Sequence, residues 1–85
     1  MDSKLEIFKK KLIYRAGYRG TKEMDILLTE FVKKYLNSFN DEQLRQLEKF
    51  LEFEDEIIYN FYNFDKVKKD INKNKISEIF KNFKI

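Results

Sequence analysis

The fold is decided by residues 21–35, which read TKEMDILLTEFVKKY. Their apolar members recur three and four residues apart, and they are Met24, Leu27, Leu28, Phe31 and Tyr35. That spacing gathers them on one face and predicts an amphipathic helix rather than a strand. Thr21 is suited to cap the N-terminus, because its hydroxyl oxygen can accept a backbone N–H. Glu23 and Asp25 then fall in the first turn, where the helix dipole favours negative charge.

The chain on either side shows the same helical spacing. Upstream, residues 3–6 (SKLE) have the pattern of a capping box and open a first helix. Gly17 and Gly20 are the only glycines, and they end this helix because glycine accepts the left-handed conformation common at helix C-termini. Downstream, residues 40–43 (NDEQ) open a third helix in the same way. The apolar residues of the first and third helices are Leu5, Phe8 and Leu12, and Leu44, Leu47, Phe50 and Leu51.

The last third of the chain predicts two or three shorter segments. A fourth apolar segment contains Ile57, Ile58, Phe61 and Tyr62. Residues 63–65 form a boundary, with Asp65 as a possible cap. In the tail, Val67 and Ile71 predict one helical turn, and Ile76, Ile79, Phe80 and Phe83 predict another. We therefore expect an all-α fold, a small four- or five-helix bundle with short loops, in a single domain over residues 1–85 with the tail 63–85 the least regular part.

The composition excludes most kinds of catalytic site. The 85 residues include no cysteine and no histidine, so the chain lacks a thiolate nucleophile and the commonest general base and metal ligand. Carboxylates gather in residues 52–56, but paired carboxylates act in catalysis only where a cleft separates their pKa values. A domain of this size has little room for such a cleft, and we interpret the run as a solvated face. The sequence predicts no enzyme, no metal site and no cofactor held stably by this chain.

The net charge of +3 is unevenly distributed. Residues 1–23 and 66–85 are basic, whereas residues 24–65 are acidic. This arrangement suits a partner of mixed polarity better than a uniform polyanion. Arginine is scarce, and the tail phenylalanines share a face with isoleucines, which is typical of a core. We therefore expect no nucleic-acid partner.

No stretch approaches the ~20 apolar residues that a membrane span requires. The first residues, 1–5, also lack the apolar run of a signal peptide. From these absences we expect no membrane insertion, a cytoplasmic location and a monomeric chain when free.

Two interpretations of residues 19–23 (RGTKE) are open. In one, Arg19 closes the first helix, Gly20 is its C-cap, and Glu23 sits at the start of the second. In the other, the guanidinium of Arg19, the bare backbone of Gly20 and the carboxylate of Glu23 form a patch that docks onto another protein. Tyr14 and Tyr18 precede the patch, and tyrosine is a favoured interface anchor.

The stretch 11–28 (KLIYRAGYRGTKEMDILL) resembles the signature of the succinate dehydrogenase assembly factors, also called flavinators. The family's Arg-Gly-x-x-Glu motif is met by Arg19, Gly20 and Glu23. An acidic residue and an aliphatic run follow it, here residues 25–28, and Ile13-Tyr14 is similar to an upstream aliphatic–tyrosine pair. The resemblance covers residues 5–62, and a weaker acidic–aromatic pattern within it occupies residues 51–61. In that pattern Glu56-Ile57 and Phe61 depart from the family's usual residues.

The resemblance implies an assembly factor, or chaperone, without chemistry of its own. It implies binding to the flavoprotein subunit of succinate dehydrogenase, and in some cases of fumarate reductase. There it would promote covalent attachment of FAD to a histidine of that subunit. Carried over, the partner-binding residues are Arg19, Gly20 and Glu23, with Tyr14, Tyr18 and Asp25 as neighbours.

Two alternatives of other classes stay open on the sequence. One is a generic helical protein-interaction module in which residues 19–23 are only a cap. The other is a small basic nucleic-acid-binding protein, which would show steeply salt-dependent binding.

Overall fold

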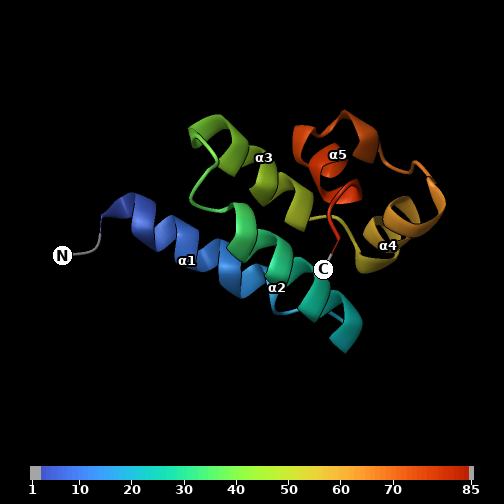
Figure 1. Cartoon of the computed structure of the whole chain (residues 1–85), viewed down its shortest axis with the longest axis horizontal. Coiled ribbons are helices and arrows are strands. Elements are labelled where there is room, and N and C mark those ends of the chain that lie inside the picture. Colours follow the sequence, from blue (N-terminus) through green and yellow to red (C-terminus); the bar gives the residue numbers. More distant parts are fainter. Residues whose placement is uncertain (1–2, 85) are drawn as a thin grey trace.

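A computed structural model describes residues 3–84, and these contain five α-helices and one 3-10 helix (Figure 1). The predicted all-α bundle is confirmed. The helices are α1 (Lys4–Ala16), α2 (Lys22–Tyr35), α3 (Asp41–Leu51), α4 (Asp55–Phe64), η1 (Ile71–Lys73) and α5 (Lys75–Lys81). No helix in this part of the chain is long and apolar enough to cross a membrane.

Local capping explains where the first three helices begin. The side chains of Ser3 and Thr21 accept the N–H groups of residues three positions along, each at 3.2 Å. Asn40 and Gln43 form a reciprocal capping box, with bonds of 2.8 and 2.9 Å. Each of these caps satisfies N–H groups that the first turn of a helix leaves without an internal partner.

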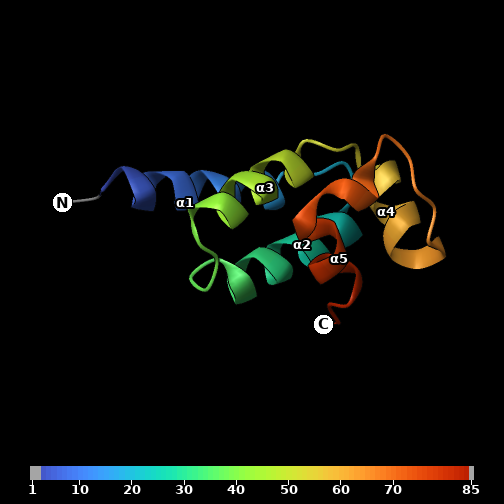
Figure 2. The ribbon, with the colours of Figure 1, turned by 90° about the horizontal axis from the view of Figure 1, so that it is seen from above.

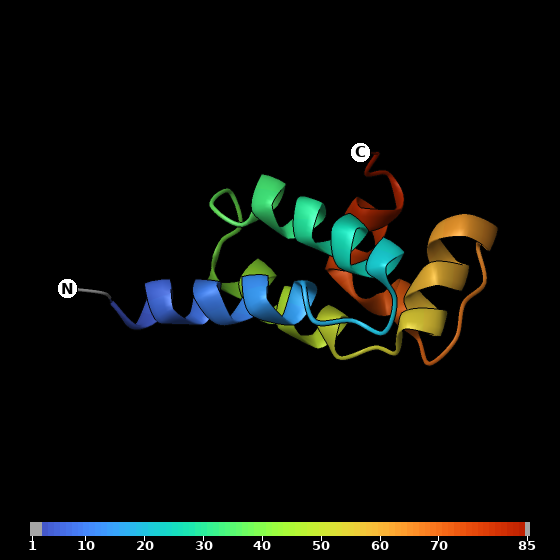
Figure 3. The ribbon, with the colours of Figure 1, turned by 90° about the horizontal axis from the view of Figure 1, so that it is seen from below.

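The helices form an elongated bundle of 43 × 26 × 21 Å. α1 and α2 run antiparallel and pack together, and α3 packs on α1 on one side and on α5 on the other. Seen from above, the amino-terminal half of α1 extends beyond the other helices, and α4 lies at the opposite end (Figure 2). The view from below shows the same projection, with the short α1–α2 connection beside the start of α4 (Figure 3).

The core is centred on three fully buried rings, Phe31, Phe50 and Phe80, contributed by α2, α3 and α5. The Phe80 ring lies 5.1 Å from that of Phe31 and 5.2 Å from that of Phe50, in tilted or edge-on arrangements that aromatic pairs favour. The tail is therefore part of the core.

Hydrogen bonds also join the tail to α3 and α4. The hydroxyl of Tyr62 donates to the carbonyl of Phe83 at 2.7 Å, and the amide of Asn74 donates to the carbonyl of Gln46 at 2.9 Å. On the surface, Lys75 Nζ lies 2.8 Å from Glu42 Oε1, and this ammonium lowers the pKa of the Glu42 carboxyl.

One prediction for the tail is confirmed and another was wrong. Asp65 caps the end of α4 at the predicted boundary, in the left-handed conformation with φ 59°. The helical turn predicted from Val67 and Ile71 does not include Val67. Val67 is 51% exposed and lies outside any helix, whereas the 3-10 turn forms at Ile71, which is buried. A single turn has no periodicity to reveal its position, so burial of Ile71 decides where it forms.

Candidate functional site

The candidate site is built on the connection between α1 and α2, residues 17–21, which we call the Arg19 junction. The Arg19 side chain is only 9% exposed and points into the connection between α3 and α4. Its Nε donates to Asp55 Oδ1 at 2.6 Å. Its two terminal nitrogens donate to the carbonyls of Leu51 and Phe53, each at 2.8 Å. The planar guanidinium thus joins two connections that are more than 30 residues apart in the chain.

Two carboxylates complete the Arg19 junction. Asp55 accepts from Arg19 with one oxygen and, with the other, from the N–H of Gly20 at 2.6 Å. Asp25 accepts the N–H of Arg19, also at 2.6 Å. Asp25 and Asp55 both lie in the first turn of a helix, where the helix dipole stabilises their charge. The junction is therefore an internal clamp, in which one carboxylate pairs with the guanidinium and both carboxylates accept backbone N–H groups.

Close approach, not an unusual backbone conformation, explains Gly20. The prediction that the two glycines adopt the left-handed conformation was wrong: neither glycine has a positive φ, and Gly17, the C-cap of α1, has φ −91°. A Cβ on Gly20 would lie 3.0 Å from Asp55 Oδ2. A Cβ on Gly17 would lie 3.3 Å from Thr29 Oγ1.

We expect Gly20→Ala to lower the free energy of unfolding by about 1–2 kcal/mol, because the new methyl group displaces a hydrogen-bonded carboxylate. Gly17→Ala is the matched control. The neighbour of Gly17, Thr29, carries no charge, and the φ of Gly17 suits alanine. We therefore expect the free energy of unfolding to change by no more than about 0.5 kcal/mol. Urea denaturation of both variants measures the difference. A loss at Gly20 of less than about 0.5 kcal/mol would show that Asp55 moves aside without cost.

The six residues predicted to bind a partner fall into two groups. The Arg19 junction holds Arg19, Gly20 and Asp25 in internal contacts. The exposed group comprises Tyr14, Tyr18 and Glu23. The guanidinium of Arg19 is occupied by two carbonyls and a carboxylate of the α3–α4 connection, and its contact with a partner stays a prediction.

Asp55 is the residue that sequence reasoning missed. It was included in the solvated acidic face of residues 52–56, and its neighbours Glu52, Glu54 and Glu56 are indeed exposed. Its position directly after a helix boundary was the available signal, since a carboxylate at a helix N-terminus is often structural.

A shallow groove of about 400 Å³ opens beside the junction, between the N-termini of α2 and α4. Its lining residues are Thr21, Glu23, Met24, Asp55, Glu56 and Tyr59. Met24 is buried, whereas Glu23 and Glu56 are exposed. The half-buried Tyr59 gives the groove apolar surface, and Glu23 and Glu56 give it two exposed carboxylates. Within residues 3–84, no cluster of three or more His, Cys, Asp and Glu side chains is placed to hold a metal ion.

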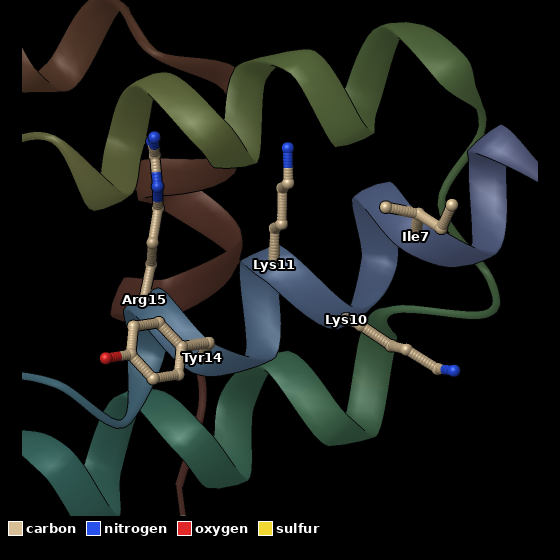
Figure 4. Close-up of a pocket in the computed structure, with 5 residues that line it drawn as sticks. All are labelled: Ile7, Lys10, Lys11, Tyr14 and Arg15. Atoms are coloured by element: carbon tan, nitrogen blue, oxygen red, sulfur yellow. The ribbon is translucent and has the colours of Figure 1, made fainter.

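A second hollow, of about 300 Å³, lies along the outward face of α1 (Figure 4). It is lined by Ile7, Lys10, Lys11, Tyr14 and Arg15. Tyr14 also stacks on Tyr18, with ring centroids 5.4 Å apart, so this face continues to the Arg19 junction.

Comparison with known proteins gives one consistent family. The family model that matches is described as flavinator of succinate dehydrogenase, and it matches residues 10–84. That match includes the tail, for which the sequence resemblance offered no counterpart. No solved structure matches the chain significantly.

Curated relatives carry names consistent with this family. The chain is 42% identical over 55 residues to "Succinate dehydrogenase assembly factor 2, mitochondrial" of Scheffersomyces stipitis, covering 65% of this chain and 37% of the relative. It is 44% identical over 50 residues to "Succinate dehydrogenase assembly factor 2-B, mitochondrial" of Drosophila willistoni, covering 59% of this chain and 32% of the relative. The chain thus spans about a third of the length of these relatives.

Proposed function

The chain belongs to the family of succinate dehydrogenase flavinators, and on that premise we propose that it binds the flavoprotein subunit of succinate dehydrogenase and assists covalent attachment of FAD. The observation that carries the proposal is the family match over residues 10–84, which includes the whole Arg19 junction. A client in fumarate reductase is a prediction that rests on the resemblance alone.

The geometry supports a division of roles within the motif. Internal contacts of Arg19, Gly20 and Asp25 position the α1–α2 connection. Glu23 is exposed at the rim of the groove, and Tyr18 is 76% exposed. We assign the contact with the flavoprotein to these exposed residues and a positioning role to Arg19.

In this proposal the chain acts as a chaperone, and the attachment chemistry belongs to the flavoprotein and its flavin. A factor that binds one conformation of its client more tightly raises the population of that conformation by its differential affinity. A rigid junction favours this role, because less conformational entropy is lost when a preorganised surface binds. The chain itself needs neither a catalytic group nor a resident cofactor.

The location of the chain stays a prediction. The relatives are named mitochondrial, and cytoplasmic location was the expectation from the sequence. The monomeric state is likewise a prediction.

Co-expression with the flavoprotein subunit tests the proposal. We expect the wild-type chain to raise covalent flavin at least tenfold over the subunit alone, and Glu23→Lys to remove most of that gain. Glu23 is chosen over Gly20 because a side chain at Gly20 meets Asp55 and disturbs the junction. In-gel flavin fluorescence of the denatured subunit measures the covalent product.

The matched control is Glu30→Lys, which makes the same charge change at another exposed position of α2. We expect it to behave as wild type. If covalent flavin is the same with and without the wild-type chain, the proposed function is wrong. If the wild-type chain raises covalent flavin but Glu23→Lys and Glu30→Lys give equal yields, Glu23 is not a contact residue.

A further inference from the structure

The outward face of α1 has an apolar centre that its own helices leave uncovered. We call this surface the α1 strip; it consists of Ile7, Lys10, Lys11, Tyr14, Arg15 and Tyr18. Ile7 is 47% exposed and Tyr14 is 66% exposed. The opposite face of α1 is committed to the core through Leu12 and Ala16, both buried. The exposed side chains of Ile7 and Tyr14 are therefore available to contact another molecule.

Cations border the apolar centre on both sides. Figure 4 shows Lys11 and Arg15 extending toward α3 and Lys10 extending the other way, with Ile7 and Tyr14 between them. Ile7 and Tyr14 are seven residues apart, or about two helical turns. Apolar residues two turns apart, with charged residues on both sides, are typical of a helix that packs against an amphipathic partner helix.

We propose that the α1 strip binds an acidic amphipathic helix of the flavoprotein partner, with an apolar side chain seated between Ile7 and Tyr14 and carboxylates facing Lys11. The proposal rests on the proposed function, and it extends the partner surface from the Arg19 junction along α1. The Tyr14–Tyr18 stack makes the two regions continuous.

The charges at the α3 edge favour a protein segment over a uniform polyanion. Arg15 lies 3.9 Å from Glu48 and 4.0 Å from Glu52, and both carboxylates are substantially exposed. A membrane of anionic lipid or a nucleic acid would bring its negative surface against these glutamates. A partner helix can place its carboxylates opposite Lys11 and away from Glu48 and Glu52.

The apolar area also suits a helix. An interfacial membrane helix buries a continuous apolar face 5–10 Å deep, as a general rule. The centre of the α1 strip offers one isoleucine and two tyrosines whose rings stack on each other. That area accommodates one or two side chains of a partner.

Binding to the purified flavoprotein subunit, measured by isothermal titration calorimetry at several salt concentrations, tests the proposal. We expect Lys11→Glu to weaken binding about tenfold and to reduce its salt dependence, because it removes one attractive charge and adds a repulsive one. We expect Tyr14→Ala to weaken binding at least fivefold with the salt dependence unchanged. Circular dichroism of each variant confirms that it is folded.

Matched controls on other faces are Lys33→Glu on α2 and Val67→Ala beyond α4, both at exposed positions. We expect them to bind as wild type. Equal binding by wild type, Lys11→Glu and Tyr14→Ala would overturn the role of the strip and leave the proposed function intact. No binding by the wild-type chain would overturn the proposed function, and with it this inference.

Two further probes test whether the α1 strip binds an anionic membrane or a nucleic acid instead of a protein helix. The wild-type chain is mixed with vesicles containing 30% phosphatidylserine and, separately, with a 20-base-pair DNA duplex. We expect binding to neither at physiological salt. Binding that Lys11→Glu abolishes would identify a polyanion as the ligand and overturn the choice of a protein helix.

Discussion

Arg19→Ala is expected to lower the free energy of unfolding by about 3 kcal/mol, the low end of the range for removing one partner from a buried ion pair, because the Asp55 side chain is still 24% exposed. The Arg19 side chain is 9% exposed, and its guanidinium makes three hydrogen bonds across the molecule. Its loss leaves the carbonyls of Leu51 and Phe53 without that donor and leaves Asp55 without its counter-charge. For a domain of this size the loss is a large part of the whole stability.

Urea denaturation followed by circular dichroism measures this loss. The control is Arg15→Ala, four residues earlier on α1. Arg15 pairs with Glu48 and Glu52 at 3.9 and 4.0 Å on the surface, so its removal is expected to cost less than about 1 kcal/mol. Arg19→Lys should recover only part of the stability, because an ammonium cannot reproduce the planar fork. Similar small effects at Arg19 and Arg15 would show that the clamp does not stabilise the fold.

Phe80→Ala is expected to cost about 3–5 kcal/mol, the range for truncating a buried phenylalanine. The ring is fully buried and lies 4.8 Å from that of Tyr62, besides its contacts with Phe31 and Phe50. Four helices therefore lose packing when this one ring is removed. The result tests whether the tail is part of the cooperative core.

Thermal and urea denaturation measure the change, with Ile26→Ala as the control. Ile26 is 49% exposed on α2, and its truncation is expected to change stability by no more than about 0.5 kcal/mol. A loss below about 1 kcal/mol at Phe80 would mean that α5 does not share the core of α2 and α3.

The helices and most of the core could be predicted from the sequence because their signals are local. Three- and four-residue spacing identified the buried faces of α2 and α3, and short capping sequences fixed where these helices begin. The same logic found Phe80 and Phe83, which are buried as expected from their shared face with Ile76.

The clamp could not be predicted, because its members come from distant parts of the chain. Arg19 meets Asp55 across 36 positions and reaches two carbonyls that have no sequence signature. An arginine beside a glycine is compatible with a docking patch and with an internal clamp alike. Only the tertiary arrangement distinguishes them, and the internal contacts of Arg19 support the positioning role that we propose for it.

Photo-cross-linking from position 18 tests most directly the claim that the exposed side chains at the Arg19 junction, Tyr18 among them, meet the flavoprotein. A photo-reactive phenylalanine analogue replaces Tyr18 in one variant and Phe64, which is 60% exposed at the end of α4, in another. Each variant is co-expressed with the flavoprotein subunit, irradiated and resolved by denaturing electrophoresis. We predict a covalent adduct with the subunit from position 18 and none from position 64. An adduct from position 64 alone would contradict the assignment of the partner surface to the Arg19 junction.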